Sequence, residues 1–131
     1  MSESPARSTS SPWNVALDRL DAPAPEPPDA PTEADLVPWR ERIDAIDEAV
    51  ILLLNERARY AAEIGRIKRT IGLPVYVPTR EEQVLQNVMR TNPGPLPGAS
   101  VRRLFERIID ETRSLERKLH ESLPNPNDDS E

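Results

Sequence analysis

A long apolar seam in residues 39–68 leaves little choice of secondary structure for that part of the chain. Apolar side chains recur there at gaps of three and four residues, the spacing that places them on one side of an α-helix. They are Ile43, Ile46, Val50, Leu53, Tyr60, Ile64 and Ile67. The same spacing reaches Arg57 in the middle of the seam. An unpaired guanidinium in an apolar interface is costly, so we expect a carboxylate side chain or an anionic ligand to meet it.

This helix has recognisable ends. Asp35 is a suitable N-cap, and Pro38 falls in the first turn, where its missing N–H costs no helical hydrogen bond. The helix is expected to end near Thr70, because Gly72 and Pro74 follow. At about 35 residues it would be roughly 50 Å long, more than the remainder of residues 36–120 can cover. We therefore expect a partner chain.

Two further helices are predicted, one short and one of medium length. The short helix should begin at Thr79, which can form a capping box with Glu82, and should end near Thr91 before the sequence NPGPLPG. The other should begin at about Ala99 or Ser100. Its apolar series is Val101, Phe105, Ile108, Thr112, Leu115 and Leu119. Because the aromatic content is only 4% and there are four glycines, a β-sandwich or Rossmann-type sheet is disfavoured, and the predicted class is all-α with three helices.

Segments rich in proline, alanine and acidic residues flank the predicted domain. Residues 1–35, which include APAPEPPDAP, and the acidic residues 121–131 are predicted to be disordered, because they cannot bury enough apolar surface to offset the entropy of ordering. The helical domain is expected at residues 36–120. The net charge is −6, but the flanking segments hold −5 and −4, so the domain itself carries +3.

This charge distribution limits the classes of ligand that the domain is expected to bind. Acidic flanks on a mildly basic domain do not favour nucleic acid, whereas a small anionic ligand is compatible with it. There is no cysteine, hence no disulfide framework, and no apolar run approaches the roughly 20 residues that a membrane span needs. We expect a cytoplasmic protein that does not bind membranes.

Positively charged residues define the candidate site. Lys68 follows Arg57 by eleven residues, about three helical turns, so the two cations face one volume within roughly 20°. Arg80 opens the second helix. Arg40 lies 17 residues before Arg57, about 25 Å of rise and roughly 100° of rotation away, so it can serve a ligand only in the site of a second molecule. The pattern indicates an antiparallel helical dimer whose sites each bind a compact dicarboxylate.

The sequence offers no other catalytic set. There is no Ser-His-Asp arrangement, no glycine-rich phosphate loop and no histidine cluster for a metal ion. We expect chemistry without a cofactor, a metal or a covalent intermediate. From periodicity alone, however, Arg57 could equally pair with a glutamate of a neighbouring helix in a coiled coil.

Five ordered strings resemble one family across residues 36–117: WRERIDAIDEAV, LLNERARYAAEIGRIK, PVYVPTREEQVL, NPGPL and LFERIIDETRSLE. The resemblance is to the all-helical (AroQ) class of chorismate mutases. It implies an interlocked homodimer with two active sites. It also implies rearrangement of chorismate to prephenate, on the route to phenylalanine and tyrosine, as the activity.

The resemblance also implies roles for single residues. Arg40 looks like the arginine lent to the other subunit's site, Arg57 like the one that binds a substrate carboxylate, and Lys68 like the lysine that bonds the ether oxygen and a carboxylate. The remaining implied substrate contacts are Arg80, Glu81, which would receive the ring hydroxyl, Thr112, Glu116 and the backbone of Val77. The implied catalytic residues are Lys68, Glu116 and Arg57.

Protonation of Glu116 is a separate hypothesis. In this rearrangement the breaking C–O bond gathers negative charge on oxygen, which fixed cations stabilise. Glu116 can donate a hydrogen bond to that oxygen only when protonated, and its pKa is raised by burial and lowered by nearby cations. We expect activity to fall as pH rises through its titration.

Two alternatives stay open. One is an isochorismate pyruvate-lyase, which would share the fold and the cationic site. The other is a non-catalytic helical module that regulates, or docks on, another enzyme of the shikimate pathway, with the proline-rich segment as its tether.

Overall fold

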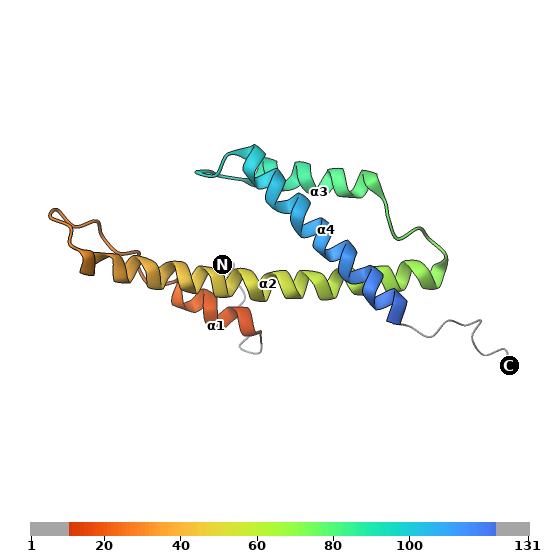
Figure 1. Ribbon diagram of the computed structural model, residues 1–131, viewed down its shortest axis with the longest axis horizontal. Helices are drawn as coiled ribbons and strands as arrows, with labels where there is room; N and C mark the ends of the chain where they lie inside the picture. The colour runs from red at the N-terminus through yellow and green to blue at the C-terminus, as the bar shows by residue number, and fades with distance from the viewer. Residues whose placement is uncertain (1–10, 123–131) are drawn as a thin grey trace, which may run out of the picture. The chain divides into compact units, whose positions relative to one another are not determined.

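The computed structural model describes residues 11–122, and these residues form helices without a strand. In chain order they are α1 (Pro12–Arg19), the short 3₁₀ helix η1 (Glu33–Asp35), α2 (Leu36–Ile71), α3 (Pro78–Thr91) and α4 (Gly98–Ser122) (Figure 1). The chain divides into two units, Met1–Glu56 and Arg57–Glu131, and α2 contributes to both. None of the described helices is long and apolar enough to cross a membrane.

In the first unit, α1 is held to the first part of α2 by polar contacts at its C-terminal end. Arg42 donates to the carbonyl oxygens of Leu20, the C-cap of α1, at 2.8 Å and of Ala22, just after it, at 2.6 Å. Arg19 forms an ion pair with Glu48. The buried residues are Asn14 and Ala16 on α1 and Ala45 and Ala49 on α2; three of the four are alanines, so the two helices can approach closely.

In the second unit, α3 and α4 pack against each other through Leu85 and Val101, both of which are buried. Arg102 of α4 donates to both carboxylate oxygens of Glu82 of α3, at 3.1 and 3.0 Å. The turn between the helices is closed by Asn92, whose side chain donates to the Leu96 carbonyl at 2.7 Å. These contacts orient α3 and α4 as one wall of the candidate site.

The apolar seam of α2 stays largely exposed in the single chain. In the first unit the exposed fractions are 55% for Ile43, 44% for Ile46, 45% for Val50 and 43% for Leu53. The buried apolar side chains among the described residues are Ala16, Ala45, Ala49, Leu85 and Val101. In the described part of one chain, few of the apolar side chains that follow the helical pattern are therefore buried.

The prediction of an all-α chain is confirmed, but the prediction of three helices was wrong. The fourth helix, α1, lies inside residues 1–35, which were expected to be disordered. Pro12 occupies its first turn, where proline is favoured, and contacts with Arg42 and Glu48 stabilise it. The expectations for residues 1–10 and 123–131 fall outside the described residues, whereas Glu121 and Ser122 continue α4.

The predicted start of the short helix was also wrong. Helix α3 begins one residue earlier than expected, with Val77 as N-cap and Pro78 in the first turn, and Glu82 is bonded to Gln86 and Arg102 instead of forming a capping box. Helix α2 begins at Leu36, directly after Asp35, and the Asp35 carboxylate accepts the Thr32 backbone N–H at 2.7 Å within η1. The predicted ends of α2 near Thr70 and of α3 near Thr91 agree with the structure.

Candidate functional site

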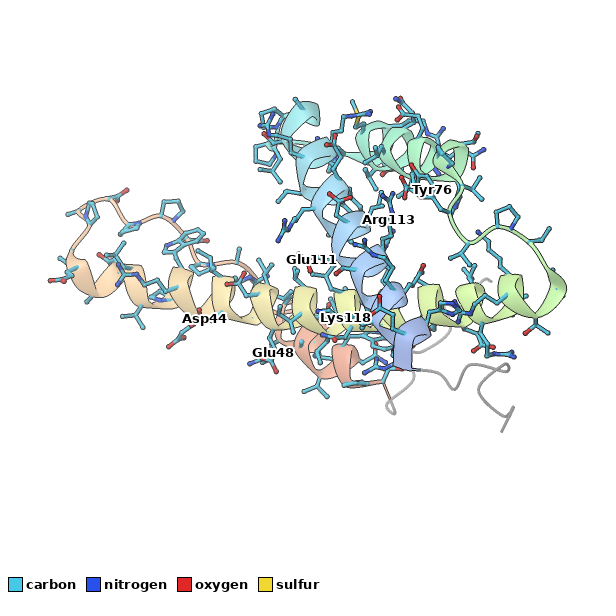
Figure 2. All side chains as sticks on the ribbon, turned by 45° about the vertical axis from the view of Figure 1, so that its right-hand side comes forward. Asp44, Glu48, Tyr76, Glu111, Arg113 and Lys118 are labelled. Atoms are coloured by element: carbon cyan, nitrogen blue, oxygen red, sulfur yellow. The ribbon has the colours of Figure 1, made fainter. Side chains whose placement is uncertain are left out.

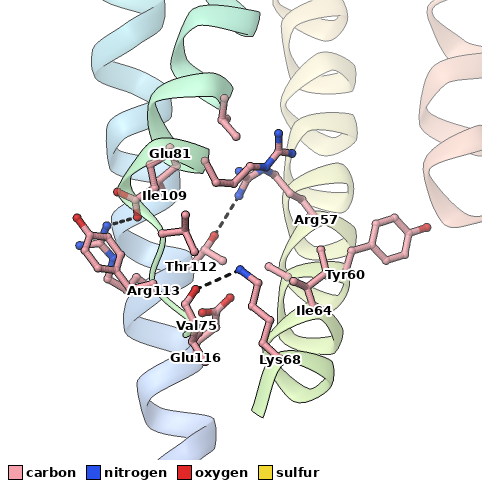
Figure 3. A pocket seen from close by; sticks show the side chains of 16 residues that line it. Arg57, Tyr60, Ile64, Lys68, Val75, Glu81, Ile109, Thr112, Arg113 and Glu116 are labelled. Atoms are coloured by element: carbon pink, nitrogen blue, oxygen red, sulfur yellow. Dashed lines mark hydrogen bonds and ion pairs between the residues drawn. The ribbon is translucent and has the colours of Figure 1, made fainter. Parts of the chain in front are cut away.

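An open cavity of about 470 Å³ lies within the second unit, lined by residues of α2, α3, α4 and the linker between α2 and α3 (Figure 3). This is a size typical of small-molecule sites. Seven of the eight residues that the sequence predicts to bind substrate line it: Arg57, Lys68, Val77, Arg80, Glu81, Thr112 and Glu116. The helices thus bring together residues that lie up to 59 positions apart in the sequence.

Arg57 and Lys68 reach the cavity from α2. Arg57 donates to Thr112 Oγ1 at 3.3 Å, and Lys68 Nζ donates to the carbonyl oxygen of Val75 at 3.3 Å (Figure 3). The Thr112 hydroxyl in turn donates to the Ile108 carbonyl at 2.8 Å, so its single hydrogen is used inside α4. Toward the cavity, Thr112 therefore acts as an acceptor that orients Arg57.

Helix α2 ends in a way that positions Lys68. Gly72 adopts a φ of +80°, and the Leu73 N–H donates to the Lys68 carbonyl at 2.8 Å, which is the pattern of a Schellman cap. Lys68 thus holds this helix end through its backbone and the following linker through its side chain.

The start of α3 places Arg80 and Glu81 at the cavity. Both backbone N–H groups donate to the carbonyl of Val77, the N-cap residue, at 3.1 and 3.3 Å. Val77 therefore orients the first turn through its backbone. The positive charge of Arg80 acts on Arg57 across the cavity: burial lowers the pKa of Arg57, the charge of Arg80 lowers it further, and Glu116 opposes both.

Glu116 faces α2 from α4 at the position of Gly65, which is buried. A Cβ added to Gly65 would make an ordinary contact with the Glu116 carboxyl carbon at 3.9 Å and a tight one with an Arg69 nitrogen at 3.3 Å, so the absence of a side chain at residue 65 leaves room for both groups. Burial raises the pKa of Glu116, while the charges of Lys68, Arg69, Arg113 and Arg57 act in the opposite sense. The net upward direction favours the protonated, hydrogen-bond-donating form.

Nine of the sixteen residues that line the cavity were not among the predicted site residues, and two of these nine, Arg113 and Tyr76, contact each other. Arg113 forms an ion pair with Glu81 and lies under the ring of Tyr76, with its guanidinium carbon 4.3 Å from the ring centroid (Figures 2 and 3). A signal was available for Arg113, because it precedes Glu116 by three residues and therefore shares its side of α4.

Arg40 is the predicted site residue that does not line this cavity. It belongs to the first unit and is exposed on α2. Its role in a second molecule's site stays a prediction.

The charges of the cavity favour an anionic ligand. Four cations line it, Arg57, Lys68, Arg80 and Arg113, together with the carboxyl groups of Glu81 and Glu116. Within the described residues, no three histidine, aspartate or glutamate side chains gather as a metal site would require. The arrangement is suited to binding carboxylates and to stabilising negative charge that develops on an oxygen.

Comparison with known proteins gives a consistent result. The family described as chorismate mutase type II matches residues 39–117. A bifunctional chorismate mutase/prephenate dehydratase of Neisseria gonorrhoeae is 46% identical over 84 residues, which cover 64% of this chain but only 23% of that protein. A chorismate mutase of Methanocaldococcus jannaschii is 25% identical over 67% of this chain and 90% of its own length.

A solved structure of chorismate mutase from Thermus thermophilus aligns with a TM-score of 0.61 at 38% identity, over 63% of this chain and 93% of that one. The all-helical arrangement is therefore shared with a known structure. The chain spans about a quarter of the length of the bifunctional relatives, such as those of N. gonorrhoeae and Aquifex aeolicus.

Proposed function

Because the chain belongs to the chorismate mutase type II family, we propose that it converts chorismate to prephenate in the cavity bounded by α2, α3 and α4. The observation that carries this proposal is the gathering of seven predicted substrate contacts around that one cavity. The bifunctional relatives pair a chorismate mutase with a prephenate dehydratase, an enzyme that by its name acts on the product proposed here.

The chemistry needs two contributions from the protein. Arg57 binds a carboxylate of the substrate and holds the enolpyruvyl arm over the ring. Binding thereby keeps the two reacting carbons close to each other. Lys68 and protonated Glu116 donate hydrogen bonds to the ether oxygen, where negative charge grows as the C–O bond breaks. The reaction requires no proton transfer to carbon and no covalent intermediate, so these hydrogen bonds and charges are sufficient.

We further propose that the active form is a homodimer in which Arg40 completes the site of the partner subunit. The exposed seam of α2 supports this, since Ile43, Ile46, Val50 and Leu53 are each more than 40% exposed in one chain. A helix with such a seam gains stability when a second apolar surface covers it.

The direct test is the loss of chorismate absorbance on addition of the purified protein, with identification of the product. Prephenate formation is expected. Release of pyruvate from isochorismate without prephenate formation from chorismate would instead identify an isochorismate pyruvate-lyase. If neither compound is consumed, with or without a partner enzyme of the shikimate pathway, the enzymatic proposal is wrong and a binding module remains.

A further inference from the structure

Arg113 lines the cavity and lies outside the predicted set, and its side chain contacts two other segments of the chain. Its Nη2 donates to Glu81 Oε1 on α3, and its guanidinium lies 4.3 Å from the ring centroid of Tyr76 in the linker. Figure 2 labels Tyr76 beside Arg113, and Figure 3 marks the bond between Arg113 and Glu81. Three separate segments, α4, α3 and the linker, thus meet at one guanidinium.

This arrangement restricts the Glu81 carboxylate. A planar guanidinium stacked on a ring has little rotational freedom, and its N–H groups point in fixed directions in that plane. The side chains of Arg113 and Glu81 are 37% and 28% exposed, so water only partly screens the pair. The hydrogen bond uses Oε1 and leaves Oε2 able to accept a hydrogen bond from a ligand.

The pairing of Arg113 with Glu81 also reduces electrostatic repulsion between Glu81 and an anionic ligand. Glu81 lines a cavity whose other charges suit a dicarboxylate, and a lone carboxylate there would repel such a ligand. Arg113 offsets that charge without removing the acceptor. The favourable interaction with Glu81 is the largest of the contributions that raise the pKa of Arg113.

We propose that Arg113, held under Tyr76, is a positioning residue that fixes Glu81 so that Oε2 accepts the ring hydroxyl of the substrate. The pair then discriminates between a ring that carries this hydroxyl and one that lacks it. This inference rests on the proposed function, because it concerns how the same cavity recognises chorismate.

The chain contains a matched control pair. Arg102 of α4 binds Glu82 of α3, the residue next to Glu81, and neither Arg102 nor Glu82 lines the cavity. Both pairs link the same two helices. A purely structural role for Arg113 would therefore give Arg113→Met and Arg102→Met similar consequences for stability and for activity.

The experiment is a double-variant cycle on chorismate turnover with Arg113→Met, Glu81→Gln and both together. The hydroxyl is present in the ground state and in the transition state, so each single variant should raise KM about tenfold with kcat changed less than about twofold. The double variant should be no worse than Glu81→Gln alone, because Arg113 acts through Glu81. Arg113→Lys should recover part of the loss, since it retains charge but not the planar fork.

A chorismate analogue with hydrogen in place of the ring hydroxyl separates positioning from simple charge attraction. With this analogue, Arg113→Met should raise KM less than it does with chorismate, because only the loss of charge compensation at Glu81 remains, whereas an effect that came from charge alone would be equally large with both compounds. Arg102→Met and Glu82→Gln should leave KM for chorismate unchanged. They should lower Tm by about as much as Arg113→Met and Glu81→Gln do.

Two outcomes would overturn the inference while the proposed function stands: additive losses in the double variant, or an undiminished effect of Arg113→Met on the analogue. A wild-type protein that does not turn over chorismate would overturn the proposed function, and the inference with it.

Discussion

The ammonium group of Lys68 lies at the end of α2, 3.3 Å from the Val75 carbonyl and on the wall of the cavity. A neutral carbonyl is a weaker partner for an ammonium than a carboxylate, so a substrate oxygen that gains negative charge can compete for this hydrogen bond. Within the proposed mechanism, Lys68 is therefore the residue whose removal should matter most for the rate.

Replacing Lys68 with alanine should lower kcat by about 100-fold or more, the usual loss when one donor to a developing oxyanion is removed. Steady-state turnover of chorismate measures this. Lys118→Ala is the control, because Lys118 is exposed on α4 and does not line the cavity. Equal kcat values for the two variants would contradict the proposed role.

Glu116 gives a pH dependence of activity. Burial raises its pKa, so the protonated form persists to a higher pH than for an ordinary glutamate, and activity should fall as pH rises through that titration. Glu116→Gln keeps the donor at every pH and should flatten the pH profile of kcat/KM. Glu111→Gln, at an exposed residue of α4 paired with Arg107, should retain the wild-type profile. A pH dependence that persists in Glu116→Gln would show that another group titrates.

The same pKa shift has a consequence for stability. Between the ordinary value of 4.5 and the raised folded-state pKa, the folded protein binds more protons than the unfolded chain, so stability falls as pH rises through that window. Glu116→Gln removes this loss. Its Tm should exceed that of wild type at neutral pH and approach it at pH values below 4.5, as thermal unfolding across pH would measure. A lower Tm at neutral pH would mean that the nearby cations outweigh burial.

At the scale of elements, the junction between α2 and α3 determines where Lys68 and Tyr76 lie. Gly72 closes α2 in the left-handed region, and the linker then returns toward the Lys68 side chain through Val75. Helix α3 starts at the end of this linker, so a change in the linker conformation would displace Arg80 and Glu81.

Gly72→Ala should lower the free energy of unfolding by about 1–2 kcal/mol, because a residue with a Cβ is strained at a φ of +80°. Chemical denaturation measures this. Gly98→Ala is the matched control: Gly98 begins α4, and a Cβ there would meet only the Met89 methyl group at 3.9 Å, an ordinary contact. Equal stability of the two variants would mean that the backbone at residue 72 can relax.

At the scale of the whole molecule, the seam of α2 is an apolar surface that the single chain leaves exposed to solvent. Its side chains follow the helical repeat, whereas the buried residues of this part of α2, Ala45 and Ala49, are offset from the seam around the helix. Helix α1 therefore leaves the seam open, and a second copy is the partner we propose for it.

The protein should behave as a homodimer in size-exclusion chromatography with light scattering. Val50→Asp places a charge in the seam and should yield monomers that lose chorismate turnover, because the partner's Arg40 is then absent from each site. Val50→Leu keeps the seam apolar and should retain both the dimer and its activity. A wild-type monomer that turns over chorismate at full rate would refute the requirement for a partner.

Several features could be predicted from the sequence because their causes are local. The length of α2 follows from its periodic apolar residues and from Gly72, and the shared facing of Arg57 and Lys68 follows from the helical repeat. The stop of α3 follows from the proline-rich turn after Thr91. In each case the residues that decide the outcome lie within a few turns of one another.

Only the tertiary structure decided which partners meet across long sequence distances. Helix α1 depends on Arg42 and Glu48, 22 and 29 residues from their contacts, and Glu82 pairs with Arg102 instead of capping α3. Arg113 meets Glu81 and Tyr76 because α3 and the linker bring these two residues against α4. A local pattern fixes the direction in which a side chain points on its own helix, whereas the group that it meets there depends on how the helices pack.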